Sequence, residues 1–250
     1  MYRHSPPDRP HLSVIIPAYN EERRVGITLD LFCAYLEDHG YDYEMLVVDD
    51  GSTDGTAEVV QARAQHNSRL RMIACARNRG KGAAVRRGML SAGGELLLFS
   101  DADLSTPPTE LPKLLEAIEQ GYDLAIGSRG LPESDLRLRQ SWYREYMGRT
   151  FNLLVRMIAV PGIHDTQCGF KVFRKGAAKE LFRHQLLPGF AFDVEVLFLA
   201  RRLGYRVKEV PVVWINSPRS SVRPLVDSIR MLRDLLKIRL CALAGRYRER

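Results

Sequence analysis

Two aspartates separated by a single residue, Asp101 and Asp103, are the side chains best placed for metal chemistry in this sequence. They follow the apolar run Leu96–Phe99, and such a run is typical of a strand buried on both faces of a parallel sheet. Paired carboxylates at the end of a buried strand are unfavourable unless a cation lies between them. Ligands of open α/β sheets bind beyond the carboxyl ends of strands, and hard oxygen atoms favour Mg²⁺ or Mn²⁺. We therefore predict a divalent cation that holds a phosphorylated ligand; the alternative is a surface turn with a capping aspartate.

Two further polar segments point to the same kind of site. Asp49 and Asp50 end an earlier apolar run and are followed by turn residues. Residues 77–84 are rich in arginine and glycine around Lys81 and open a predicted helix, although Gly82 stands where a P-loop has Ser or Thr. Backbone amides at a helix N-terminus, with a lysine nearby, can bind a diphosphate. The alternative is that this segment is only the start of a helix, made flexible by its glycines, and binds no ligand.

Short apolar segments alternate with amphipathic ones along most of the chain. The periodicity predicts strands over 12–16, 44–48, 70–74, 96–99, 123–127, 172–173 and 207–213. It predicts helices over 20–39, 56–66, 110–120, 144–157, 177–183, 196–203 and 224–243, and another that ends at 92. Asn20 and Asp193 are the expected N-caps of two of them. This order predicts an α/β fold with a mainly parallel sheet, flanked by helices and joined by right-handed crossovers.

Composition limits the class of protein and its partners. The 250 residues and 45% hydrophobic content are sufficient for a buried core, and the net charge of +7 favours anionic partners. Four widely spaced cysteines argue against a zinc site and a disulfide framework. No nucleic-acid-binding module is recognisable, so we expect no nucleic-acid partner. The oligomeric state is not predicted.

The two ends of the chain carry separate expectations. Residues 1–11 are polar and proline-rich, which predicts a disordered lead-in and no signal peptide. No apolar stretch reaches the roughly 20 residues that span a bilayer. The helix predicted over 224–243 has leucines at helical spacing and cationic neighbours. It either packs against the domain or lies on a membrane as a basic amphipathic helix, and we expect a cytoplasmic protein peripherally attached to the cytoplasmic face.

Five motifs occur in a specific order, and together they resemble the inverting nucleotide-sugar glycosyltransferases of the GT-A, Rossmann-like fold. The motifs are Val14–Glu22, Val48–Thr56, Asn78–Gly82, Asp101–Asp103 and Gly127–Arg129. The resemblance covers about residues 12–238, which gives a GT-A domain over 12–223 and a basic helix and tail over 224–250. Residues 165–171 and 190–195 resemble the dolichyl-phosphate β-glucosyltransferase branch, whose close neighbour is the dolichyl-phosphate mannose synthase branch.

The resemblance implies transfer of a hexose, with glucose from UDP-glucose favoured, to a polyprenyl or dolichyl phosphate with inversion. It implies a set of site residues. The nucleotide-sugar pocket would be formed by Pro17, Tyr19, Glu21, Asp49, Asp50, Lys81 and Asp101. The metal, Mg²⁺ or Mn²⁺, would be bound by Asp101 and Asp103, which act in catalysis together with Arg129. The acceptor side would have Arg129, Arg144 and Arg219 at the phosphate and Gln167 and Asp193 in a loop. Mannose synthases have a metal-binding glutamine where this chain has Ser105.

Three alternative functions remain open. The first is a mannosyltransferase that uses GDP-mannose. The second is a GT-A enzyme with an alcohol acceptor, which needs a general base such as Asp193 or Glu195; a phosphate acceptor needs none, because its second pKa of about 6 leaves it largely dianionic at neutral pH. The third is a non-catalytic module that binds sugar nucleotides or anionic lipids.

Overall fold

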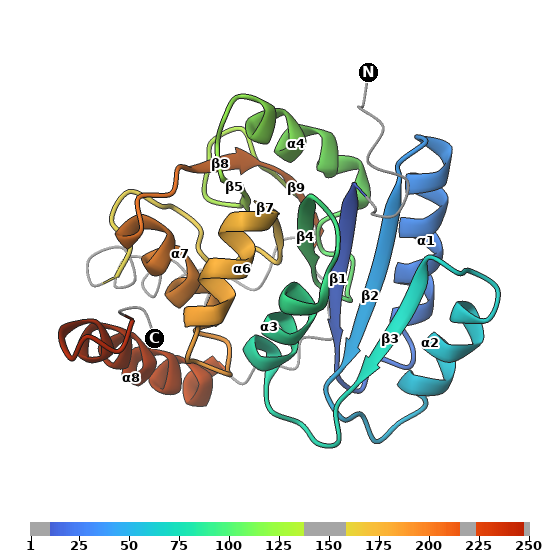
Figure 1. Cartoon of the computed structure of the whole chain (residues 1–250), viewed down its shortest axis with the longest axis horizontal. Helices are drawn as coiled ribbons and strands as arrows, with labels where there is room; N and C mark the ends of the chain where they lie inside the picture. Colours follow the sequence, from blue (N-terminus) through green and yellow to red (C-terminus); the bar gives the residue numbers. More distant parts are fainter. Residues whose placement is uncertain (1–10, 138–158, 216–223, 248–250) are drawn as a thin grey trace.

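The computed structural model describes residues 11–137, 159–215 and 224–247 of the 250-residue chain. In this part of the chain, seven strands form one central sheet in the order β3-β2-β1-β4-β7-β5-β8 (Figure 1). Its strands are β1 (Leu12–Ala18), β2 (Tyr43–Asp49), β3 (Leu70–Ala74), β4 (Leu96–Ser100), β5 (Leu124–Ser128), β7 (Phe170–Arg174) and β8 (Val207–Pro211). A small parallel pair is made by β6 (Asp135–Arg137) and β9 (Val213–Ile215).

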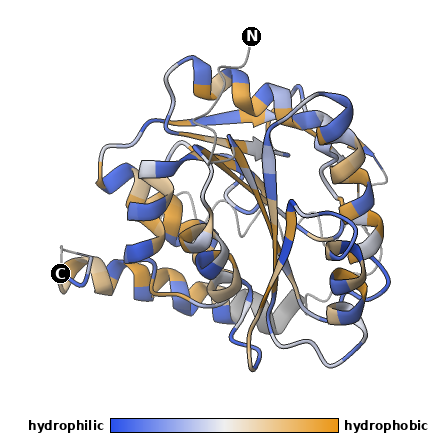
Figure 2. Cartoon of the chain, turned by 45° about the vertical axis from the view of Figure 1, so that its right-hand side comes forward, coloured by the Kyte–Doolittle hydropathy of each residue, from blue (hydrophilic) through white to orange (hydrophobic). Residues whose placement is uncertain are grey.

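Helices cover both faces of the sheet. One face packs against α1 (Val25–Asp38), α2 (Thr56–Ala64) and α4 (Leu111–Glu119), the last preceded by a 3-10 turn over Pro108–Glu110. The other face packs against α3 (Lys81–Ser91), α6 (Lys175–His184), α7 (Phe192–Arg202) and α8 (Pro224–Leu243). Figure 2 shows the hydrophobic residues gathered on the strands and on the inward sides of the helices. The predicted α/β class with a mainly parallel sheet is therefore confirmed.

β1 lies between the parallel strands β2 and β4, and it is mainly apolar because both of its faces are buried. Ile15 points into the core under α3, whereas Val14 and Ile16 point into the core under α1. The prediction ended this strand before Pro17, but the strand continues to Ala18. β1 pairs with β4 only as far as Ile15. Pro17 has no N–H to donate, but its position lies beyond this pairing, so no hydrogen bond to β4 is lost.

β7 is the exception to the parallel order. It contains the strand predicted over 172–173, but its antiparallel direction was not predicted. It runs antiparallel between β4 and β5, with Lys171 opposite Phe99 and Phe170 opposite Ser100. The residue before β7 therefore lies beside the residue after β4, and the Asp101 amide donates to the Gly169 carbonyl at 3.0 Å. This insertion brings residues 165–171 to the edge where β4 ends.

Two predicted helix caps are wrong. Asn20 does not cap α1, which begins at Val25; it has a positive φ of 55°, and its side chain accepts a hydrogen bond from the Thr53 amide at 2.9 Å. Asp193 does not cap α7, because it is the second residue of that helix and follows Ala191 at the N-cap. Each side chain is engaged with a distant segment, which a local capping pattern cannot reveal.

The last helix, α8, has the predicted bounds of 224–243. Leu235, Ile238 and Cys241 are buried in the same core cluster as α7. Among the described residues, no helix is long and apolar enough to cross a membrane. The helix predicted over 144–157, with Arg144, and the loop that carries Arg219 lie outside the described residues.

Candidate active site

The polar residues singled out from the sequence gather at one edge of the sheet. β1, β2, β4 and β5 run in the same direction, so their carboxyl ends lie at the same edge. Asp50 follows β2, Asp101 follows β4 and Arg129 follows β5, while Lys81 is the first residue of α3. Residues from four separate parts of the sequence therefore meet at one edge of the sheet and form one polar site.

Lys81 pairs with the first aspartate of the central motif. Its Nζ lies 2.6 Å from Asp101 Oδ1 and 5.3 Å from the centre of the Phe99 ring. Burial lowers the pKa of Lys81, but the charges of Asp101 and Asp193 outweigh it and leave that pKa above its ordinary value. Lys81 is therefore a fixed positive charge beside Asp101.

A second ion pair lies deeper in the same site. Lys171 Nζ lies 2.5 Å from Asp193 Oδ1 and 2.6 Å from the Cys168 carbonyl oxygen, and both side chains of the pair are buried. Burial raises the pKa of Asp193, partly offset by the charges of Lys171 and Lys81. Asp193 therefore holds Lys171 in the core, and this buried pairing disfavours it as a free general base.

The Asp101 carboxylate occupies space that only a glycine leaves open. A Cβ atom added to Gly169 would lie 1.9 Å from Asp101 Oδ2 and 2.3 Å from its Cγ. Asp103 lies in the turn that follows, where its Oδ1 accepts a hydrogen bond from the Ser105 amide at 3.0 Å. The Ser105 carbonyl in turn accepts from the Ile215 amide at 2.8 Å, so the turn is fixed on both sides.

Glu21 adds a third carboxylate close to this pair. Burial raises the pKa of Glu21; Arg24 opposes the rise, and the charges of Asp103 and Asp101 add to it. The Arg24 guanidinium donates two hydrogen bonds of 2.6 Å to the Glu21 carboxylate. Glu21 therefore adds negative charge to the surroundings of Asp101 and Asp103, where Lys81 and Arg129 lie as opposing cations.

The residues present fit a divalent cation that shares its ligands with a substrate. In the described residues, no three His, Cys, Asp or Glu side chains cluster into a complete protein cage for a metal. Mg²⁺ in proteins takes one or two carboxylates and completes its shell with water and substrate phosphates. Asp101 and Asp103 match that donor set, and Lys81 already shows that a cation is favourable beside Asp101.

The acidic pair after β2 fixes the loops around the site. Asp50 is buried and accepts hydrogen bonds from the Arg79 amide at 3.1 Å and the Gly80 amide at 2.7 Å. Burial raises the pKa of Asp50, and these amide bonds oppose the rise. Asp49 accepts from Ser52, through its amide at 3.0 Å and its hydroxyl at 2.5 Å. Asp50 therefore positions the start of α3, and contact of either aspartate with a base or ribose stays a prediction.

The remaining predicted nucleotide residues come from the end of β1. Pro17 is buried in the strand, whereas Tyr19 is exposed just beyond it. The adjoining loop is fixed to the loop after β2, because the Glu21 amide donates to Thr56 Oγ1 at 2.8 Å. Their role in a nucleotide pocket stays a prediction.

Arg129 is held by a partner that the sequence reasoning did not identify. Its Nε lies 2.6 Å from Asp165 Oδ2 and its Nη2 lies 2.9 Å from Oδ1, and its guanidinium lies 5.4 Å from the centre of the Trp214 ring. The Gln167 amide donates to the same carboxylate at 3.0 Å. Burial raises the pKa of Asp165, but Arg129 outweighs it and lowers that pKa to about 2. Asp165 thus fixes the direction of Arg129.

Replacing Asp165 by Asn should destabilise the protein in a pH-dependent way. The folded-state pKa lies below the unfolded value of 3.8, so the carboxylate stabilises the fold above about pH 4 and loses this effect as pH falls toward 2. We expect the variant to lose about 2 kcal/mol of unfolding free energy at pH 7, with a smaller difference at pH 3. Urea denaturation at several pH values measures both. Asp42→Asn, at an exposed site, is the control; a difference that stays constant down to pH 2 contradicts the assignment.

Glu195, the other candidate base, holds two parts of the protein together through buried hydrogen bonds. It is fully buried, and its carboxylate accepts hydrogen bonds from the Leu186 amide at 3.0 Å, the Leu187 amide at 2.8 Å and the Tyr247 hydroxyl at 2.6 Å. Burial raises the pKa of Glu195, and these bonds oppose the rise. It joins the loop before α7 to the residues after α8, so it is not placed as a base.

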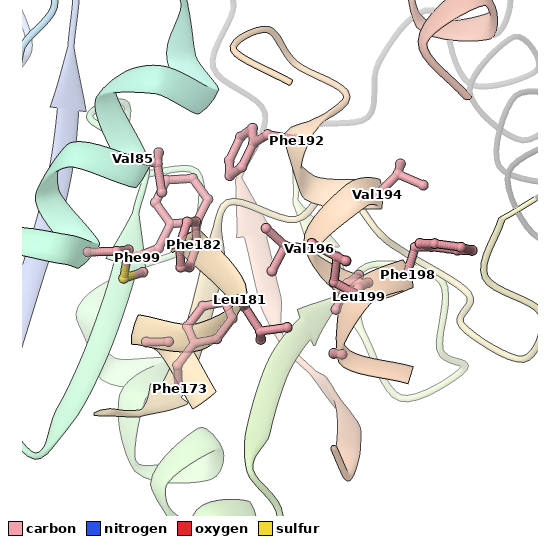
Figure 3. Packing of buried hydrophobic residues seen from close by; sticks show 14 of the residues in the cluster. Val85, Phe99, Phe173, Leu181, Phe182, Phe192, Val194, Val196, Phe198 and Leu199 are labelled. Carbon is pink, nitrogen blue, oxygen red and sulfur yellow. The ribbon is translucent and has the colours of Figure 1, made fainter. Parts of the chain in front are cut away.

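Aromatic side chains pack in the core next to the polar site. The rings of Phe99 and Phe192 meet edge to face with their centres 5.8 Å apart. Figure 3 shows Val85, Phe99, Phe182 and Phe192 gathered between α3 and α7, with Phe198 on the other side of α7. The cations at positions 81 and 171 both lie against the Phe99 ring.

Asp165 and Lys171 are the site residues to which the sequence reasoning gave no role. Both lie inside the motif 165–171 that carried the resemblance. The signal for Lys171 was a lysine between apolar residues of a strand, since such a lysine needs a buried partner. Asp165 gave no local signal, because its partner is 36 residues away.

Comparison with known proteins decides the family. The model of the family described as "Glycosyl transferase family 2" matches residues 13–182. The chain belongs to glycosyl transferase family 2. It is 40% identical to the dolichyl-phosphate beta-glucosyltransferase of Drosophila melanogaster and 37% identical to that of Homo sapiens. Each match covers 95% of this chain and 77% of the relative. The predicted family and the predicted glycosyltransferase class are confirmed.

Solved structures show that this glycosyltransferase shares its fold with mannosyl- and glucosyl-3-phosphoglycerate synthases. Mannosyl-3-phosphoglycerate synthase from Rubrobacter xylanophilus has a TM-score of 0.70 at 22% identity, over 96% of this chain and 76% of that one. Glucosyl-3-phosphoglycerate synthase from Mycobacterium tuberculosis, solved with Mn²⁺ and UDP-glucose, has a TM-score of 0.67 at 23% identity, over 94% of this chain and 79% of that one. At these identities the likeness concerns the fold, and it confirms the GT-A prediction.

Proposed function

We propose that this family 2 glycosyltransferase transfers glucose from UDP-glucose to dolichyl phosphate or another polyprenyl phosphate, with inversion at the anomeric carbon. A phosphate oxygen of the acceptor forms the new bond to that carbon, and the bond to UDP breaks with its electron pair on the diphosphate. The observation that carries the proposal is 40% identity to a dolichyl-phosphate beta-glucosyltransferase along 95% of the chain. The polar site at the carboxyl edge of the sheet supports it.

The donor end of the site is proposed at Asp101, Asp103 and the start of α3. The two aspartates would hold Mg²⁺ or Mn²⁺, and the M. tuberculosis fold neighbour with Mn²⁺ and UDP-glucose supports this choice. A cation held there supplies positive charge to the leaving diphosphate. The amides at the N-terminus of α3 and the ammonium of Lys81 add further positive potential at the same place. Asp50 keeps these amides in position by binding the preceding loop.

The acceptor end of the site needs orientation and charge compensation, and it needs no general base. A phosphate monoester has a second pKa of about 6 and is largely dianionic at neutral pH. Asp193 and Glu195, the two candidate bases, are both buried and engaged. We place the acceptor phosphate near Arg129, whose direction Asp165 fixes. Arg144, Arg219 and Gln167 remain proposed neighbours of the acceptor.

The lipid acceptor implies work at a membrane surface, and we propose peripheral attachment on the cytoplasmic face. A polyprenyl chain stays in the bilayer while its phosphate reaches the site. The net charge of +7 favours contact with an anionic surface. Nucleotide sugars are supplied from the aqueous side.

A donor and acceptor panel tests the proposal directly. The protein is incubated with radiolabelled UDP-glucose, UDP-galactose or GDP-mannose, polyprenyl phosphate, and Mg²⁺ or Mn²⁺, and label is then counted in the organic phase. We expect organic-phase label with UDP-glucose, and a β-linked product by NMR. Label from GDP-mannose alone would replace the donor assignment. Absence of label with every donor, from a folded protein that binds UDP, would indicate a non-catalytic module.

A further inference from the structure

α8 presents a row of leucines to solvent. Leu232, Leu236, Leu240 and Leu243 are 39%, 53%, 64% and 85% exposed. At about 100° per residue they fall within one arc of roughly 80° on the helix surface, and we call them the leucine stripe. Single exposed leucines are common, but a contiguous apolar patch marks an interaction site.

The leucine stripe is separate from the face that α8 buries in the protein. Leu235, Ile238 and Cys241 project from another side of the helix and pack into the core with α7. Figure 1 shows α8 at the lower left edge of the molecule, below α7 and α6, and Figure 2 shows hydrophobic and hydrophilic residues alternating along it. Packing against the domain is therefore already achieved without the stripe.

Cations border the leucine stripe on both sides. Arg233 and Lys237 follow it on one side and Arg239 lies on the other, and all three are exposed. The Arg239 guanidinium lies 5.5 Å from the centre of the Phe198 ring, which keeps it at the edge of the helix. An apolar row between cations matches the boundary between the acyl chains and the anionic headgroups of a bilayer.

We propose that the leucine stripe of α8 docks into the interface of an anionic lipid bilayer. This inference rests on the proposed function, because a polyprenyl acceptor lies in such a bilayer. It also resolves the two alternatives for this helix: one face packs against the domain while the stripe contacts lipid. The partner chemistry is an anionic membrane surface, and a second copy of the chain is the competing occupant.

Contacts of α8 and of the residues that follow it connect the docked helix to the site. Beyond its last turn, the Tyr247 hydroxyl donates to Glu195, which also binds the loop before α7. Gln185 of that loop donates to the Gly82 carbonyl at 3.0 Å, next to Lys81. Earlier in α8, Met231 Sδ accepts from Gln167 Nε2 at 3.7 Å. Docking of the stripe would therefore set the orientation of the whole site relative to the lipid.

Vesicle flotation with the full chain tests the docking surface. The double variant Leu236→Ser/Leu240→Ser is compared with Ile27→Ser/Leu31→Ser, a matched pair on α1 whose side chains are 59% and 49% exposed. We expect the wild type and the α1 variant to bind vesicles of phosphatidylcholine with phosphatidylglycerol. We expect the α8 variant to bind them at least about tenfold more weakly. Added salt should weaken the remaining binding, because surface cations contribute.

Two outcomes would overturn the proposal. One is equal vesicle binding by the α8 variant and the wild type. The other is a wild-type dimer in size-exclusion chromatography with light scattering that the α8 variant loses, without vesicle binding by either protein; this would assign the stripe to a second copy.

A soluble assay separates failure of docking from failure of the proposed function. Transfer to a short, water-soluble polyprenyl phosphate should be unchanged in the α8 variant, and circular dichroism should show an unchanged fold. A wild type that binds vesicles but transfers no sugar to any phosphate would refute the function and leave the docking surface standing.

Discussion

Replacing Asp103 by Asn is expected to lower the proposed glucosyl transfer by a factor of about 10²–10³ or more, which is the cost of removing a preorganised electrostatic contact. The variant keeps an oxygen that can accept the hydrogen bond from the Ser105 amide, so the turn after β4 should survive. What it loses is the negative charge beside Asp101. The loss should appear in kcat/KM for UDP-glucose and in the enthalpy of Mn²⁺ binding with UDP, measured by calorimetry.

Asp42→Asn is the matched control for this substitution. Asp42 is exposed on the connection before β2, away from the carboxyl edge, and the same change of charge there should leave transfer and Mn²⁺ binding unchanged. Near-normal transfer by the Asp103 variant at saturating metal would refute the metal assignment. So would wild-type Mn²⁺ affinity in the presence of UDP.

The location of the site could be predicted because it follows from local pattern and strand direction. The run Leu96–Phe99 is apolar throughout because alternate residues face two cores, with Leu98 under α4 and Phe99 under α3. Parallel strands joined by helices must all end at one edge, so charged residues after each strand converge there. The positions of Asp50, Asp101 and Lys81 needed no knowledge of tertiary contacts.

The ion pairs within the site could not be predicted, because they depend on the antiparallel insertion of β7. Nothing local in residues 170–174 indicates that this strand enters between β4 and β5. Its register alone places Lys171 opposite Phe99 and so within reach of Asp193. The local sequence therefore predicts a capping or acceptor-loop role for Asp193, and it does not reveal the buried cation that Asp193 binds.

The last helix illustrates a different limit. Periodicity gave its bounds correctly, because the leucines and cations repeat with helical spacing over 224–243. The same periodicity offered packing and membrane contact as alternatives. The structure separates them in space, since Leu235 and Ile238 are buried while Leu236 and Leu240 are exposed. The number and spacing of apolar residues in a helix do not show whether they form one broad apolar face or two narrow ones.

Replacing Gly169 by Ala is expected to lower transfer by about 10²-fold without unfolding the protein, since a displacement of about 1 Å at a reacting group has that effect. The added Cβ would lie 1.9 Å from Asp101 Oδ2, so the carboxylate must move. The three nearest atoms all belong to that side chain, so the backbone need not shift. Moving the carboxylate also breaks its 2.6 Å contact with Lys81. Steady-state kinetics and thermal unfolding measure the two effects separately.

Gly176→Ala is the matched control, because a Cβ atom there meets no atom within 4 Å and position 176 lies in α6. It should preserve activity and leave stability equal or slightly higher. A double-mutant cycle with Asp101→Asn then tests the cause. If the alanine acts by displacing the Asp101 carboxylate, it should cost far less activity in the Asp101→Asn background, because the charge whose position it disturbs is already absent. Equal losses in both backgrounds would mean that Gly169 serves some other contact, and the geometry of the Asp101 site would have to be reassigned.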